Sequence, residues 1–73
     1  MSAQTALDAR LLEAHAQGDT RALIALYTEA ADTVVDAQAF YLTHAYVFAL
    51  ECGASEVPAL RARLAALGSE PAE

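Results

Sequence analysis

The apolar residues between Ala37 and Cys52 recur at the three- and four-residue steps of a helix. One stripe is made of Phe40, His44, Val47 and Phe48, and a second of Leu42, Ala45, Tyr46, Ala49 and Leu50. Only a narrow polar edge remains, so such a helix should have neighbours on most of its sides. The pattern therefore predicts a central helix over residues 37–52.

Shorter amphipathic patterns flank this stretch. They predict helices over residues 3–16, 20–33 and 56–67. The expected apolar positions are Leu7, Leu11, Leu12, Ala14 and Ala16 in the first helix, Leu23, Leu26, Tyr27, Ala30 and Val34 in the second, and Leu60, Leu64 and Leu67 in the last. Gly18, Gly53 and Gly68 should each end a helix, because glycine accepts the left-handed conformation of a helix C-terminus.

Small polar residues give the expected helix starts. Asp19 or Thr20 should cap the second helix, Asp36 the third and Ser55 the last. The break near Asp36 has an alternative, since neither glycine nor proline lies between Gly18 and Gly53. One continuous rod over residues 21–52 would then replace two helices and favour an elongated dimer.

These elements predict an all-α fold, a small three- to four-helix antiparallel bundle. Residues 1–68 should form a single helical domain, followed by a mobile acidic tail over residues 69–73. In a chain of 73 residues with 56% hydrophobic residues, three or four short helices cannot hide all the apolar side chains. We expect an exposed apolar patch and association with another chain.

The net charge of −6, with four arginines and no lysine, argues against nucleic acid and anionic membranes as partners. No apolar run approaches the roughly 20 residues of a membrane span, and the first residues lack the pattern of a signal peptide. We expect a cytoplasmic protein, and the alanine-rich, lysine-free composition favours a bacterial source.

Residues that could carry chemistry are few and scattered. His44 is expected to be a core or interface histidine bonded to a backbone carbonyl, and Cys52 a small core residue. His15 lies near the end of the first helix, where a cation favours the helix dipole. A metal site needs three or four ligands, and no such cluster is present. We expect no enzyme activity, no metal and no cofactor.

Aromatic residues give the most specific candidate surface. Tyrosine is common at interfaces because its ring is apolar and its hydroxyl is polar. The candidate interaction or pocket face consists of Tyr27, Phe40, Tyr41, His44, Tyr46 and Phe48. Arg61 and Arg63 are expected to be solvated surface cations.

Part of the chain resembles a tetratricopeptide (TPR) repeat. The residues that match a second repeat helix are Gly18, Asp19, Leu23, Leu26, Tyr27 and Ala30. Leu42, Tyr46 and Gly53 are similar to the first helix of another repeat, although Ala39 and Thr43 stand where the family usually has tryptophan and glycine. The resemblance implies a TPR-like pair of helical hairpins that acts as a scaffold for a peptide or partner helix.

The expected function is a small non-enzymatic protein–protein interaction module, an accessory or adaptor subunit. It would dock through an apolar, tyrosine-bearing face onto another protein chain, either a second copy or a larger partner with a basic surface. The alternative is a small-ligand carrier with a pocket between the second, third and fourth helices, lined by Tyr27, His44, Tyr46 and Phe48.

Overall fold

Four α-helices joined by short turns make up the computed structural model, which describes residues 3–68. They are α1 (Ala3–Gln17), α2 (Thr20–Thr33), α3 (Gln38–Cys52) and α4 (Val57–Ala66), with one turn of 3₁₀-helix, η1 (Val35–Ala37), before α3. The described residues contain no strand, which confirms the predicted all-α class. The acidic tail predicted for residues 69–73 lies outside the described residues.

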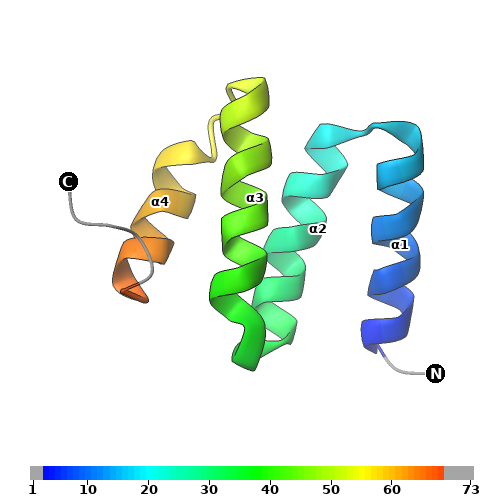
Figure 1. The fold of residues 1–73 in the computed structure, drawn as a ribbon, viewed down its shortest axis with the longest axis horizontal. Helices are drawn as coiled ribbons and strands as arrows, with labels where there is room; N and C mark the ends of the chain where they lie inside the picture. Colours follow the sequence, from blue (N-terminus) through cyan, green and yellow to red (C-terminus); the bar gives the residue numbers. More distant parts are fainter. Residues whose placement is uncertain (1–2, 69–73) are drawn as a thin grey trace.

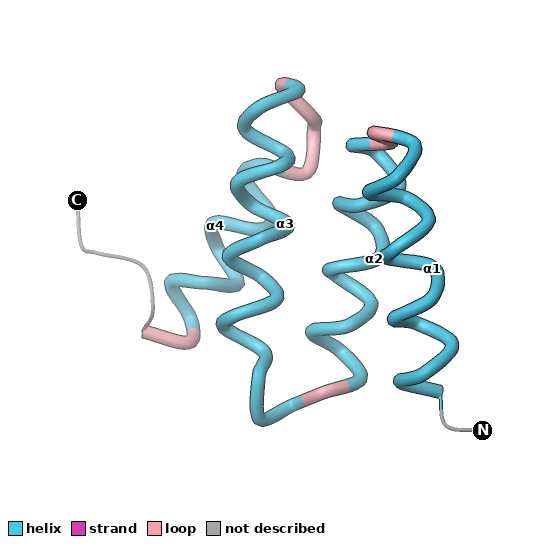
Figure 2. Tube along the Cα trace, turned by 45° about the vertical axis from the view of Figure 1, so that its right-hand side comes forward, coloured by secondary structure: helices cyan, strands magenta, loops and turns pink. Residues whose placement is uncertain are grey.

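The helices follow one another side by side in the order of the sequence (Figure 1). Successive turns lie at alternating ends, so neighbouring helices are antiparallel (Figure 2). Within residues 3–68, α2 packs against α1 and α3, and α3 also packs against α4. The molecule is correspondingly thin, with extents of 39 × 27 × 14 Å. No further helix of the described residues covers either broad face of this layer.

Two helix boundaries confirm the sequence signals. Asp19 caps α2, its Oδ1 accepting a hydrogen bond from the Ala22 N–H at 3.1 Å. Gly53 ends α3 in the left-handed conformation, with φ of 63°. Gly18 and Gly68 also have positive φ, as expected at helix ends.

Two predicted caps are wrong. Asp36 lies within η1, and the residue before α3 is Ala37, whose N–H donates to the Val34 carbonyl at 3.1 Å. The 3₁₀ turn thus satisfies backbone donors that a carboxylate cap would have bound. Ser55 lies in a turn, and Glu56 is the residue before α4.

The continuous rod is also wrong. Val34 has φ of −109° and ψ of 85°, which ends α2 and lets α3 turn back against it. In a continuous rod, α2 and α3 would not pack against each other, whereas in the structure the contact between them forms much of the core. Separate helices bury more apolar surface from the same residues.

The core has two parts that share α2. Between α2, α3 and α4 lie Ile24, Ala31, Leu42, Ala45, Ala49, Ala54, Leu60 and Leu64. Between α1 and α2 lie Leu7, Leu11, Ala14, Leu23, Leu26 and Ala30. Ala31, Ala45 and Ala49 are fully buried, and their small side chains let α2 and α3 approach closely.

Several residues expected in the interior are exposed. Leu12 is 71% exposed because, among the described helices, α1 packs along α2 alone and buries one row of side chains. Ala16, Leu67 and Cys52 are also exposed, so the expectation of a core cysteine is wrong. Among residues 3–68, no helix combines the length and the apolarity that a membrane crossing requires.

Candidate interaction face

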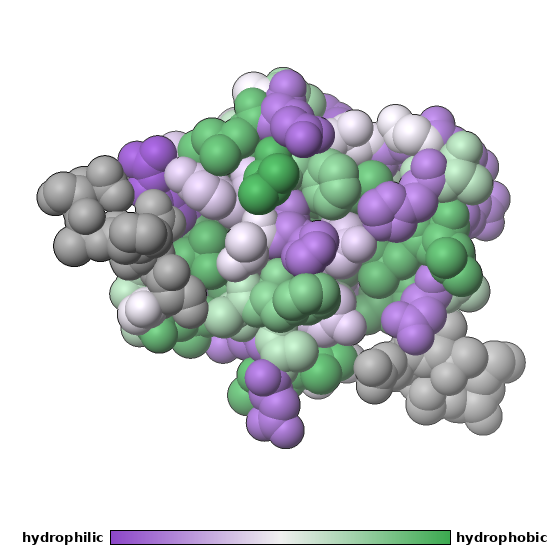
Figure 3. Space-filling model, viewed as in Figure 1, coloured by the Kyte–Doolittle hydropathy of each residue, from purple (hydrophilic) through white to green (hydrophobic). Residues whose placement is uncertain are grey.

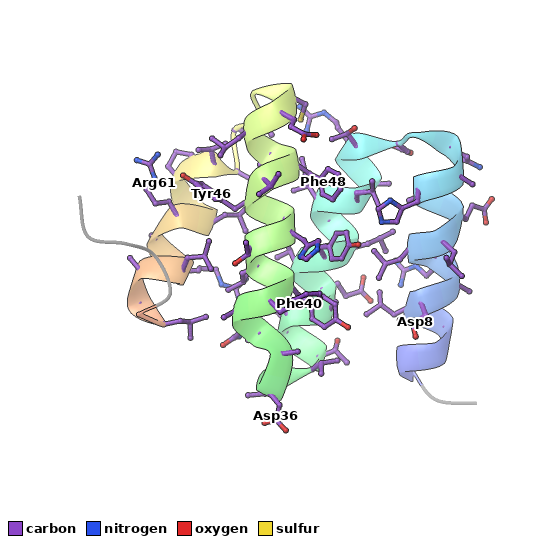
Figure 4. The ribbon with its side chains drawn as sticks, viewed as in Figure 1. Asp8, Asp36, Phe40, Tyr46, Phe48 and Arg61 are labelled. Atoms are coloured by element: carbon purple, nitrogen blue, oxygen red, sulfur yellow. The ribbon has the colours of Figure 1, made fainter. Side chains whose placement is uncertain are left out.

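Tyr27 is the centre of an aromatic cluster formed by three helices. Its ring stacks on those of His44 and Phe48 from α3, with centroids 5.1 and 5.8 Å away. It also lies 6.1 Å from the Tyr41 ring and 5.9 Å from the His15 ring, which comes from α1. The cluster comprises His15, Tyr27, Phe40, Tyr41, His44 and Phe48. Phe48 lies on the side of α3 that faces α2 (Figure 4).

Two hydrogen bonds orient the polar members of the cluster. His15 Nε2 and the Tyr27 hydroxyl are 2.9 Å apart, which ties α1 to α2. His44 Nδ1 lies 2.9 Å from the Phe40 carbonyl oxygen, so Nδ1 carries the proton and donates it. This bond is the one expected for a structural histidine.

The phenol of Tyr27 is held in its neutral form. Burial raises the pKa of Tyr27 above its usual value, and the nearby Tyr41 raises it further. At physiological pH the Tyr27 hydroxyl is therefore a hydrogen-bond donor and acceptor, not a base. The described side chains also include no group of three or more that could hold a metal ion.

The outer side of α3 exposes three large apolar side chains. Phe40 is 58% exposed, Val47 45% and Leu50 50%. We define the outer α3 face as Phe40, Thr43, His44, Val47, Leu50 and Glu51, which share one side of the helix at three- and four-residue spacing. Figure 3 shows hydrophobic residues over α3 with a few polar ones between them. The sequence predicted neighbours on most sides of this helix, but among residues 3–68 only α2 and α4 pack along its length.

A hollow of about 260 Å³ lies on this face. Its lining residues all belong to α3: Thr43, His44, Val47, Phe48 and Glu51. The rings of Phe48 and His44 connect the hollow to the aromatic cluster. Apolar surface thus continues from the outer α3 face towards α2.

Tyr46 lies apart from the other five predicted residues. Its hydroxyl accepts a hydrogen bond from Arg61 Nε at 3.1 Å, and the Arg61 guanidinium carbon is 5.9 Å from the ring centre. Figure 4 shows both on the α4 side of α3. Residues 46 and 48 differ by about 200° around a helix, so Tyr46 cannot share a side with Phe48. Arg63 is also not a simple solvated cation, since it pairs with Asp32 of α2 at 2.6 Å.

His15 is a member of the cluster that the sequence interpretation missed. The residue was explained by the helix dipole alone. Helical side chains lean towards the N-terminus of their own helix, so in an antiparallel pair His15 and Tyr27 lean towards each other. Their contact depends on this geometry, which the sequence spacing of twelve does not suggest.

Comparison with known protein families, with characterised proteins and with solved structures gave no match for this chain.

Proposed function

We propose that this chain is a small non-enzymatic protein–protein interaction module, an accessory or adaptor subunit that docks through the outer α3 face. The observation that carries the proposal is the exposure of Phe40, Val47 and Leu50 in one row on the central helix. Large apolar side chains that line up on a surface favour contact with another apolar surface, since both are removed from water.

The surroundings of the row support a protein partner. His44 and Glu51 place polar groups among the apolar ones, and Phe48 adds an aromatic ring at the margin. Interfaces commonly combine an apolar centre with aromatic residues and a few polar groups. The partner is another protein chain, either a second copy or a larger protein with a basic surface, which the net charge of −6 would attract.

The packing of each helix against its sequence neighbours also supports a TPR-like scaffold. In this chain the four described helices form a layer one helix thick, and one broad face of that layer would be available to a partner. The proposal includes a bacterial, cytoplasmic setting, which composition alone supports.

A small-ligand carrier is the second candidate, and the hollow of about 260 Å³ is the observation in its favour. Ligand sites are commonly enclosed by several elements, whereas this hollow is lined by α3 alone. Tyr46, expected to line the pocket, contacts Arg61 instead. Native mass spectrometry of the purified chain tests this function, which requires a bound small molecule.

Sedimentation of the tagged chain in a lysate of its native host tests docking. We expect an assembly heavier than the 7.7 kDa chain, lost in Val47→Glu, because a carboxylate buried in an apolar contact is unfavourable. Leu12→Glu is the matched control, since Leu12 is an exposed apolar residue on α1. Monomeric wild-type chain in the lysate, or dissociation by Leu12→Glu and not by Val47→Glu, would contradict the proposal.

A further inference from the structure

The outer α3 face carries two polar groups whose bonding is incomplete. His44 Nδ1 donates to the Phe40 carbonyl, but Nε2 has no hydrogen-bond partner among the described residues. Glu51 is exposed and has no ion pair within the same part of the chain. A partner that covers this face must satisfy both groups, because an unpaired polar group becomes costly when water is removed.

The positions of these two groups are symmetric about Val47. His44 and Glu51 are seven residues apart, about 10.5 Å along the helix axis, and Val47 lies close to the midpoint. Two turns separate them, so both lie on the side of the face that borders α2. Thr43 and Leu50 occupy the corresponding places on the side that borders α4.

We infer that the outer α3 face binds the same face of a second copy of this chain, with the two α3 helices antiparallel and a twofold axis beside Val47. The inference rests on the proposed docking function and names its partner. A twofold axis perpendicular to the helices places His44 of each copy opposite Glu51 of the other. In this pair His44 is protonated on both ring nitrogens, so that Nε2–H donates to the Glu51 carboxylate while Nδ1–H keeps its bond to the Phe40 carbonyl. The axis also places Val47 on Val47 and Leu50 opposite Thr43.

The distribution of charge is compatible with this contact in spite of the net charge of −6. On the outer α3 face, Glu51 is the only acidic residue. Two carboxylates elsewhere are already paired, Glu29 with Arg10 and Asp32 with Arg63. The contact is confined to one helix face per copy, at the small end of stable interfaces, so the dimer should be concentration-dependent.

Sedimentation equilibrium of the purified chain tests the inference. The wild-type mass should rise with concentration from 7.7 kDa towards twice that value. Glu51→Arg and His44→Glu should each weaken the dimer roughly tenfold or more, because each destroys both symmetric pairs. The double variant His44→Glu with Glu51→Arg recreates the pairs with exchanged charge and should return the dissociation constant to within about threefold of wild type.

Asp8→Arg is the matched control for net charge. Asp8 is an exposed carboxylate on α1, outside the outer α3 face, and its reversal changes the charge by the same amount as Glu51→Arg. If only general repulsion between acidic copies governed association, Asp8→Arg and Glu51→Arg would both dimerise more tightly than wild type. A specific His44–Glu51 pair instead predicts that Glu51→Arg alone dimerises more weakly. Because His44 stacks on Tyr27, circular dichroism must show that His44→Glu and the double variant are folded, and Glu51→Arg carries the test if they are not.

A purified chain that stays monomeric at all concentrations would overturn the twofold dimer. So would a dimer that Glu51→Arg leaves unchanged or tightens. If the same purified chain is monomeric but forms a Val47-dependent assembly in the host lysate, the docking function stands and only the identity of the partner is wrong. If neither sample associates, both proposals fail.

Discussion

Individual side chains in this molecule are distinguished mainly by how many helices surround them. Leu42 is fully buried between α2 and α4, whereas Leu12, of the same chemical type, is 71% exposed on α1. Tyr27 lies between these extremes, with a half-buried ring and a hydroxyl bonded to His15. The energetic value of each residue follows from this placement.

Leu42→Ala and Leu12→Ala should differ strongly in their effect on stability. The first removes a buried side chain and leaves a cavity, which should lower the free energy of unfolding by about 2–5 kcal/mol. The second changes an exposed position and should alter it by less than about 0.5 kcal/mol. Urea unfolding followed by circular dichroism measures both values, and equal losses would show that the assigned core is wrong.

Tyr27 should make stability depend on pH in the alkaline range. Its pKa is raised in the folded state, so above pH 10 the unfolded chain binds fewer protons than the folded chain. The free energy of unfolding is therefore fully retained below pH 10 and falls as pH rises through the higher folded-state value. Urea midpoints across this range should fall more steeply for wild type than for Tyr27→Phe. Parallel curves would contradict the burial of this phenol.

At the scale of single elements, the helix ends show how backbone geometry decides between several plausible caps. Asp19 binds the Ala22 N–H, while Asp36 makes no cap bond because η1 leads directly into α3. Both aspartates precede an apolar helix and have the same sequence signal. Only the conformation of the connecting turn separates them.

Asp19→Ala should therefore destabilise the chain and Asp36→Ala should not. Loss of the α2 cap leaves backbone N–H groups unsatisfied and should lower the free energy of unfolding by about 1 kcal/mol. Asp36→Ala removes an exposed carboxylate without a cap bond, so a change within about 0.5 kcal/mol is expected. Thermal unfolding of the two variants tests the assignment, which an equal or reversed order would refute.

On the scale of the whole molecule, the helices form a row in which stability is shared between neighbours. Within the described part of the chain, the two outer helices, α1 and α4, each pack along one helix, whereas α2 and α3 each pack along two. Local opening of an outer helix breaks one interface, while opening of α2 or α3 breaks two. Such arrangements often open from their ends.

Hydrogen exchange should reveal this gradient. Amides in α2 and α3 should exchange more slowly than those in α1 and α4, measured by NMR or mass spectrometry at neutral pH. Leu60→Ala should speed exchange in α4, because Leu60 is buried against α3, and should leave α1 nearly unchanged. One common exchange rate for all four helices, in wild type and variant, would instead indicate fully cooperative opening.

The sequence by itself determined the local structure. Apolar residues at helical spacing and glycines at helix ends predicted four helices, because both signals act over a few residues of backbone. It also indicated that this small chain has more apolar side chains than its helices can enclose. Five of the six residues expected on one face do lie together, since periodicity places Phe40, Tyr41, His44 and Phe48 on adjoining sides of α3.

Only the tertiary structure decided which sides of the helices are covered. In the fold, Leu12 and Leu50 are exposed to solvent and His15 contacts Tyr27. Tyr46 contacts Arg61 and lies apart from the other aromatic residues. Each of these outcomes depends on how many helices pack around a given side, and that number comes from contacts between residues distant in the chain. Hydrophobic spacing specifies a stripe on a helix, but it contains no information about whether this chain or another molecule covers the stripe.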